Sequence, residues 1–413
     1  MKHWMSLAIA LTFLPTVWAA PASDDVYEEV LYHEFQSSLL SKESRNNKIY
    51  GLTVKDQSLF VDALWDLVDE EKNLEALAAL DEINSFHYQL IERLRMEILR
   101  LKYKRSLVLP EDLLEELKNN LLNPIVETRL IYTIAAYEED LLKAGHDDLI
   151  ELAKNHTKYF DISEDEVAKK EITSNIVADL FHDTPDTTTY MNGEYVLSVK
   201  IFMFCRENRI YPCLMVMKDV HGQPVRNADG SIWTHPALAS SARGLPSYVR
   251  NGNTPAGILT IDSVMPAADQ QISFGKFRRM IVNFIPKSKN ESLMRALIPE
   301  SSQNLEWWKP AIVSRDIGRN LLRIHGTGKT NLDPSTPYYP FMRTSGCIAQ
   351  RENTYDGVTF KDQRVLLDEV MKAMDLVPNY ANEVKVKGII YIMDLDDESS
   401  AVSAHDLASL GIE

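Results

Sequence analysis

The chain has 413 residues, of which 45% are apolar, so it can bury a hydrophobic core in each of two or three domains. Its formal net charge of −16 argues against nucleic acid as a partner, because a protein that binds phosphate needs a basic surface. After residue 22, no segment approaches the ~20 apolar residues that a membrane-spanning helix needs, which argues against an integral membrane protein.

Residues 1–22 have the pattern of a secretory signal peptide. Lys2 gives a positive start, the apolar run over 7–14 is short, and small residues close the segment. Cleavage after Ala19 or after Ala22 fits this pattern. The alternative is an N-terminal membrane anchor, but the apolar run is too short to span a bilayer. We therefore expect the mature protein to be soluble and exported.

Residues 23–182 have the pattern of a helical domain, to which the sequence assigns no role. Apolar residues at steps of three and four from Leu80 to Leu101 predict one helix, with Asn73 as its cap. Other boundary signals are a capping box at Ser163 and Glu166, a helix stop at Gly145, and helix starts at Pro110 and Pro124. The histidines are scattered, which indicates surface or core positions for His33, His87, His146 and His156.

The pattern changes after residue 183, where β-branched and aromatic residues alternate with turn signals. Strands are predicted within 195–217, which a polar turn at 206–209 interrupts, and then at 258–264, 279–285, 321–324 and 388–393, with one helix at 363–374. The acidic residues 394–413 are expected to form a mobile tail or one weak helix. The predicted class is therefore α+β, with a helical N-terminal domain followed by a β-rich domain over 195–393.

The three cysteines have different prospects. Cys205 and Cys213 bracket a turn between two predicted strands, so they could form a disulfide in an oxidising compartment or remain two separate thiols. A zinc site that uses His221 and His235 lacks the close cysteine spacing that such sites need, so no metal is expected. Cys347 remains as the odd cysteine, and an unpaired cysteine in an exported protein is a candidate reactive thiol.

Two short motifs can support acyl transfer: His325-Gly326-Thr327 and Ser345-Gly346-Cys347. His325 can take the thiol proton of Cys347, and a backbone carbonyl at Gly326 can orient the histidine ring. The backbone N–H groups of Gly346 and Cys347 can stabilise an oxyanion. The alternative is that His325 ends a buried strand and that Cys347 is a small buried apolar residue.

Four cations fall within the same segment, where they would lower the pKa of the thiol and bind an acidic substrate: Arg323, Lys329, Arg343 and Arg351. The run from Gly326 to Thr330 also looks like the end of a phosphate-binding loop. The full motif needs a glycine five residues before Gly328, however, and that position is Arg323. We therefore predict no nucleotide site.

The two motifs resemble the active-site signature of the YkuD-type L,D-transpeptidases, in which His-Gly precedes a Ser/Thr-x-Gly-Cys element. The second element here is Thr344-Ser345-Gly346-Cys347. A further segment, 251–257, contains Thr254-Pro255 and is followed by a predicted strand, and it is similar to the family's Gly-x-x-Thr-Pro-x-Gly turn. The resemblance covers about 195–393 and implies an L,D-transpeptidase-like catalytic domain. It does not extend to the helical half.

The resemblance implies a cell-wall enzyme of the bacterial periplasm or cell envelope. Cys347 would attack the meso-diaminopimelate carbonyl of a peptidoglycan tetrapeptide stem, D-alanine would leave, and an amine would resolve the thioester as a cross-link or an anchor. His325 would be the general base, with Gly326 orienting it, and no cofactor is expected. Peptidoglycan stems are the expected partner, with an envelope protein as a candidate partner of the helical domain. Substrate-binding residues would be Arg323, Thr327, Arg343, Thr344, Ser345 and Arg351.

Departures from the family pattern leave the fate of the thioester open. Most members have a second histidine two residues before the cysteine, where this chain has Ser345. Many members also have an arginine or asparagine soon after the cysteine, whereas residues 348–350 of this chain include neither. A divergent branch with Ser-x-Gly-Cys is closer and includes hydrolases. One alternative is therefore an L,D-carboxypeptidase or endopeptidase that hydrolyses the same bond or releases envelope proteins from peptidoglycan. The other is a non-catalytic peptidoglycan-binding scaffold. Two aromatic pairs would line a cleft or pack in a core: Trp307-Trp308 and Tyr338-Tyr339.

Overall fold

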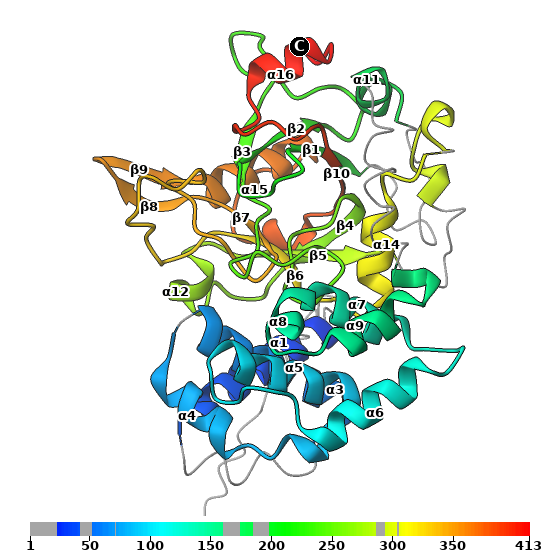
Figure 1. Cartoon of the computed structure of the whole chain (residues 1–413). Coiled ribbons are helices and arrows are strands. Elements are labelled where there is room, and N and C mark those ends of the chain that lie inside the picture. Colours follow the sequence, from blue (N-terminus) through cyan, green and yellow to red (C-terminus); the bar gives the residue numbers. More distant parts are fainter. Residues whose placement is uncertain are drawn as a thin grey trace, which may run out of the picture.

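The computed structural model describes residues 23–41, 52–70, 72–159, 174–184, 198–285, 294–303 and 305–413. Within these ranges, helices occupy the chain before Val199 and every strand lies between Val199 and Asp394 (Figure 1). The predicted α+β class is confirmed at this level. The signal-peptide prediction for 1–22 and the capping box predicted at Ser163 lie outside the described residues.

The helical half packs around one hydrophobic core that includes Phe35, Phe60, Trp65 and Leu94. Its α-helices are α1 (Ser23–Leu39), α3 (Val54–Trp65), α4 (Leu74–Glu82), α5 (Leu90–Lys102), α6 (Glu111–Leu121), α7 (Thr128–Ala136), α8 (Glu138–Lys143) and α9 (Asp147–Lys154). A π-helical turn, η1 (Asp66–Glu70), continues α3, and a 3₁₀ turn, η2 (Ser85–His87), precedes α5. A further helix, α11 (Ser174–His182), packs on the sheet instead.

The single helix predicted from Leu80 to Leu101 is wrong, because α4 ends at Glu82 and α5 begins at Leu90. Ile83 has an extended backbone, and the Asn84 side chain accepts a hydrogen bond from the N–H of Phe86. A local side-chain bond of this kind competes with the helical pattern. The apolar spacing nevertheless predicted burial correctly, since Leu80, Ile83, Leu94 and Ile98 lie in one core.

Four other helix boundaries can be compared with their sequence signals. The side chain of Asn73 caps α4 by accepting from two backbone N–H groups, and Pro110 directly precedes α6. Gly145 follows the end of α8 with a φ of 79°, a left-handed conformation that glycine adopts easily. The prediction at Pro124 is wrong, because α7 begins only at Thr128.

One mixed sheet of eight strands organises the second half, in the order β3-β2-β1-β10-β4-β5-β6-β7. Neighbours are antiparallel except for the pairs β1–β10 and β6–β7. The strands are β1 (Val199–Cys205), β2 (Cys213–Lys218), β3 (His235–Ala237), β4 (Gly257–Val264), β5 (Met280–Phe284), β6 (Leu322–His325), β7 (Ile348–Ala349) and β10 (Gly388–Asp394). A separate hairpin joins β8 (Glu352–Tyr355) to β9 (Val358–Lys361).

Both faces of this sheet are buried (Figure 1). Along β10, Ile390 and Ile392 face the core that contains α15 (Asp362–Ala373), while Ile389 and Tyr391 face the opposite core. This alternation follows from the two-residue period of a strand. The remaining short helices are α12 (Gln271–Phe274), α14 (Lys309–Asp316), α16 (Ala404–Ser409), η4 (Glu300–Ser302) and η5 (Glu383–Lys385).

The acidic C-terminal segment forms a helix, so of the two forms expected for 394–413 the mobile tail is wrong. Ser403 and Asp406 make a reciprocal capping box at the start of α16. Leu407 and Ile412 are buried in the core that also contains Tyr391. Apolar anchors at this spacing fix the segment to the sheet despite its acidic composition.

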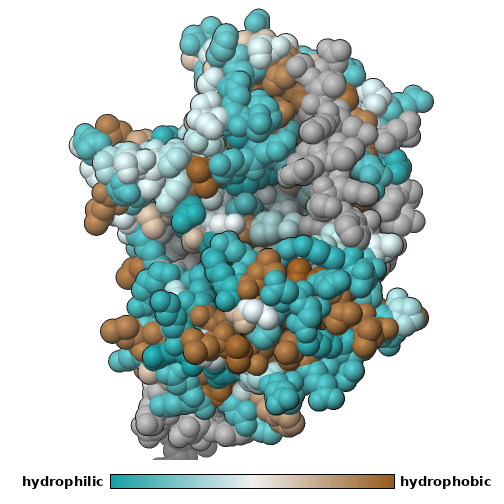
Figure 2. All heavy atoms as spheres, viewed as in Figure 1, coloured by the Kyte–Doolittle hydropathy of each residue, from teal (hydrophilic) through white to brown (hydrophobic). Residues whose placement is uncertain are grey.

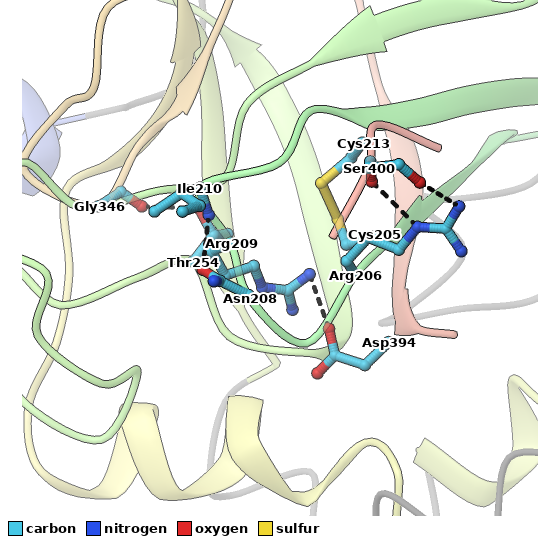
Figure 3. The surroundings of a disulfide bond; sticks show 10 residues. All are labelled: Cys205, Arg206, Asn208, Arg209, Ile210, Cys213, Thr254, Gly346, Asp394 and Ser400. Atoms are coloured by element: carbon cyan, nitrogen blue, oxygen red, sulfur yellow. Dashed lines mark hydrogen bonds and ion pairs between the residues drawn. A yellow bond between two sulfur atoms is a disulfide. The ribbon is translucent and has the colours of Figure 1, made fainter. Parts of the chain in front are cut away.

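A disulfide joins Cys205 at the end of β1 to Cys213 at the start of β2 (Figure 3). The sequence left this pairing open, and the structure resolves it. The two histidines weighed as zinc ligands have other partners: His221 pairs with Asp375, and His235 bonds the side chain of Gln350. Among the described residues, no cluster of three or more metal-ligating side chains occurs.

The surface differs between the two halves. Figure 2 shows brown, apolar atoms gathered on the helical half, where the exposed side chains include Leu74, Phe86, Leu107, Leu122 and Ile125. None of the helices in the described ranges is both long and apolar enough to cross a membrane.

Candidate active site

The two sequence motifs meet at the edge of the sheet. His325 is the last residue of β6, and Cys347 lies in the loop that leads into β7. The parallel pairing of these strands places His325 opposite Ala349, and the N–H of Gln350 donates to the His325 carbonyl at 2.8 Å. His325 and Cys347 both line one cavity of about 160 Å³.

The His325 ring is held in one orientation. Its Nδ1–H donates to the Gly326 carbonyl at 2.5 Å, which leaves Nε2 to accept a proton. The ring of Phe274 packs edge-on against it, with centroids 5.0 Å apart. A Cβ at residue 326 would lie 2.1 Å from a carboxylate oxygen of Glu352, so any other residue would force the Glu352 side chain to move. The Gly326 carbonyl therefore lies where it can orient the His325 ring.

The cysteine loop is held by the 251–257 segment, the third piece of the sequence signature. The Thr254 hydroxyl donates to the Gly346 carbonyl at 2.9 Å (Figure 3). Gly346 has a φ of 99°, and a Cβ at this position would lie 2.2 Å from the Gly252 carbonyl oxygen. Both features require glycine. The Thr344 hydroxyl bonds the Cys347 carbonyl at 2.7 Å, so the thiol stands on a rigid turn.

At neutral pH, the candidate pair rests as an uncharged thiol and an uncharged imidazole. Burial lowers the pKa of His325 to about 4, with Arg279 and Arg323 acting in the same direction. The Cys347 sulfur is surrounded by protein atoms, although the residue keeps some exposure through the cavity. Burial raises its pKa to about 11, against the opposing effect of nearby Arg323. The thiol donates a long, weak hydrogen bond to the Leu321 carbonyl at 3.7 Å.

A buried arginine beside the thiol was not found by sequence reasoning. Arg319 donates to the backbone carbonyls of Ser247, Gly252 and Asn253, at 2.5 to 2.9 Å. Burial lowers its pKa to about 10, while the nearby Cys347 acts against this shift. Arg319 therefore fixes the loop that supports Gly346 and supplies a positive charge near the sulfur. Its only signal in the sequence is its place just before β6.

Five of the six predicted substrate-binding residues line the cavity: Arg323, Thr327, Arg343, Thr344 and Ser345. Lys329, which the sequence analysis counted among the local cations, lines it as well. Arg351 does not, and its prediction is wrong. Its side chain bonds Asp362 at 2.5 Å and lies over the rings of Phe341 and Phe360. The Asp362 carboxylate, at the start of α15, therefore holds the Arg351 side chain outside the cavity lining.

The helical half supplies a wall of the same cavity, and nothing in its sequence predicted this. The residues involved are Glu29, Tyr32, His33 and Gln36 of α1, together with Asp62 and Asp66. His33, which was expected at the surface or in the core, is half-buried in this wall, where its ring packs on Phe274, which in turn packs on His325. Charged residues scattered along amphipathic helices carry no local signal for such a role.

The aromatic pairs have structural roles. Trp307 and Trp308 are buried in the core that contains Tyr391, so a cleft role for them is wrong. Tyr338 packs near Phe341 and under Arg343, and the Tyr339 hydroxyl bonds Asp356. No helix follows directly after the Gly326–Thr330 run, whereas a phosphate-binding loop must open onto a helix. This run therefore lacks the helix that the phosphate-binding loop motif includes.

Comparisons with protein-family models, with curated proteins and with solved structures produced no match to this chain. His325 and Cys347 line one cavity, and Thr254 of a third segment bonds the Gly346 carbonyl beside the thiol.

Proposed function

We propose that the protein is an exported cysteine acyltransferase that acts on peptidoglycan tetrapeptide stems, with an L,D-transpeptidase-like catalytic domain over about 195–393. The observation that carries this proposal is the contact between sequence motifs. The Thr254 hydroxyl bonds the Gly346 carbonyl, which holds the Cys347 loop on the cavity that His325 also lines.

In the proposed first step, Nε2 of His325 takes the thiol proton while Sγ of Cys347 bonds the carbonyl carbon of the donor peptide. The N–H groups of Gly346 and Cys347 are proposed to stabilise the oxyanion. The imidazolium then returns its proton to the leaving amine, and D-alanine departs from a thioester. The Gly326 carbonyl holds the ring throughout, because it accepts from Nδ1 at 2.5 Å.

In the second step, an acceptor amine attacks the thioester carbon, loses its proton to His325, and the thiol is restored. Water in place of the amine gives hydrolysis. The L,D-carboxypeptidase or endopeptidase activity is the second candidate, because Ser345 stands where most members of the resembled family have a second histidine.

The test is incubation of the purified protein with tetrapeptide-rich peptidoglycan. Wild-type protein should release D-alanine, and product mass spectrometry should show either cross-linked or trimmed stems. Cys347→Ala should do neither. Equal release by this variant would contradict the proposal. Cross-linked products would identify a transferase, and trimmed stems alone would identify a hydrolase. A carbapenem adduct on Cys347 would separately argue against a non-catalytic scaffold.

A further inference from the structure

The cavity already contains a carboxylate that belongs to the protein. Glu29 of α1 is 7% exposed and forms an ion pair with the guanidinium of Arg279, just before β5. Its other oxygen lies 3.7 Å from Nε of Arg323 on β6. The two guanidinium side chains are each 1% exposed. A desolvated pair of arginines that faces one carboxylate is a favourable anion site.

This carboxylate lies within electrostatic reach of the reacting atoms. Glu29 lines the same cavity as Cys347, and its negative charge contributes to the raised pKa of the thiol. Arg279 packs on the ring of Phe274 at 4.2 Å, and that ring contacts His325. Arg279 also forms an ion pair with Asp269, which is 58% exposed. Glu29 is the acid of α1 that both reaches this arginine pair and lines the cavity.

The two ends of α1 are attached in different ways. Phe35 and Leu39, near its end, are buried in the helical core, and the ring of Phe35 packs on Phe60 at 5.5 Å. Near its start, Glu28 bonds the side chain of Asn320, and Glu29 bonds Arg279. The apolar end is fixed within its own half, whereas the polar end makes contacts that another anion can replace.

We propose that Arg279 and Arg323 form a binding subsite for a carboxylate of the acyl donor, and that Glu29 occupies this subsite when no donor is bound. This inference rests on the proposed function and names the chemistry of its donor, a peptide with a free carboxylate beside the attacked carbonyl. A neutral donor that displaced Glu29 would take one carboxylate away from two buried guanidinium groups and replace it with nothing, which is unfavourable. The subsite therefore selects acidic donors, and α1 competes with them.

The test measures whether the subsite takes a small carboxylate once Glu29 loses its charge. Iodoacetate and iodoacetamide both alkylate a thiolate: sulfur bonds the methylene carbon and iodide leaves. They differ in that only iodoacetate carries a carboxylate. Because Cys205 and Cys213 form a disulfide, labelling at Cys347 can be followed on the intact protein. The ratio of the two rate constants, iodoacetate over iodoacetamide, reports the anion subsite.

In Glu29→Gln we expect this ratio to rise by about tenfold over wild type, the size of one charge-assisted hydrogen bond. The matched control is Glu34→Gln, which removes a carboxylate from an exposed position of the same helix and should keep the wild-type ratio. Adding Arg279→Gln to Glu29→Gln should return the ratio to the wild-type value. A ratio in Glu29→Gln within about twofold of Glu34→Gln would overturn the proposal.

Two further measurements keep the result interpretable. Circular dichroism and thermal unfolding check that each variant is folded. If Glu29→Gln does not fold, Glu29→Asp replaces it, since it keeps the charge but holds the carboxylate one methylene further from the arginines. This variant should also raise the iodoacetate-to-iodoacetamide ratio. An unchanged ratio would overturn the proposal. Labelling involves no peptidoglycan, so it separates this inference from the proposed function. A raised ratio without D-alanine release would keep the anion subsite and reject its assignment to a peptidoglycan donor.

Discussion

The two halves of the molecule contribute to the candidate site in different ways. The sheet half supplies the nucleophile, the base and their supports, and these groups are joined by short backbone contacts such as those at Gly326 and Gly346. The helical half supplies a wall and negative charge, through side chains of α1, α3 and η1. The chemistry is therefore local to the sheet half, and access to it depends on the helical half.

Buried ion pairs join the two halves, and in each of the pairs described below the helical half supplies the acid and the sheet half supplies the arginine. Acids of the helical half, Asp62 and Asp66, pair with Arg250 and Arg243 of the sheet half, as Glu29 does with Arg279. Burial would raise the pKa of Asp62, but its arginine neighbours together lower it below the ordinary value. The sheet half thus presents a cationic surface around the cavity, and the helical half neutralises it.

The largest expected effect comes from His325→Gln, which removes the proposed base within the sheet half. The rate of D-alanine release should fall by about a thousandfold, a typical contribution of general base catalysis. His146→Gln is the control, because His146 is buried in the helical half and accepts from the N–H of Leu109. Equal losses in the two variants would show that neither histidine acts chemically.

Next in size is Asp62→Asn, which breaks the charge array between the halves. Asp62 bonds both Arg95 at 2.5 Å and Arg250, so its loss removes the carboxylate that these two arginines share and leaves Arg95 with Glu92. The free energy of unfolding should fall by about 3 kcal/mol, as for other broken buried pairs. Urea unfolding of Asp62→Asn measures this difference, with Glu34→Gln as the control variant. Two variants of equal stability would contradict the view that charge joins the halves.

A pH dependence of similar size should come from His325. Its folded pKa of about 4 lies below the ordinary 6.5, so between these values the unfolded chain binds a proton that the folded chain does not. Stability should therefore be lost as pH falls from about 6.5 towards 4, by up to about 3 kcal/mol. Urea unfolding at several pH values measures this loss. In His325→Gln, the part of the pH dependence that comes from His325 should be absent. An unchanged pH profile in the variant would refute it.

The smallest expected effect concerns the support of the cysteine loop. Thr254→Val removes the hydrogen bond to the Gly346 carbonyl, which should cost about 1 kcal/mol of stability and slow D-alanine release about tenfold. Thr260→Val is the matched control, since its hydroxyl also donates to a backbone carbonyl, that of Asn283, within the sheet. If the control lost as much activity, loop support would not be the cause.

Sequence patterns predicted the elements that have a long apolar run. Strands β1, β2, β4, β5, β6 and β10 and helix α15 lie where their residues predicted them. β3 and β7 were missed because two or three residues carry no period. The β8–β9 hairpin was missed although Asp356-Gly357 is a turn signal.

The candidate site shows the same contrast between residues with a local sequence signal and residues whose role depends on packing. His325, Gly326 and Cys347 were found because the local chemistry of a histidine, a glycine and a thiol is visible in short motifs. Glu29 and Arg279 were not found, because their pairing joins residues 250 positions apart and depends on how the halves pack. Arg351 was assigned wrongly for the converse reason, since closeness in sequence to Cys347 did not reveal its partner Asp362.

The central claim is that Cys347 carries the acyl group, and intact-protein mass spectrometry tests it most directly. Wild-type protein mixed with a tetrapeptide stem and quenched in acid should gain the mass of the stem minus D-alanine, and Cys347→Ala should gain none. An adduct of the same mass on Cys347→Ala, or D-alanine release by that variant at the wild-type rate, would contradict the claim.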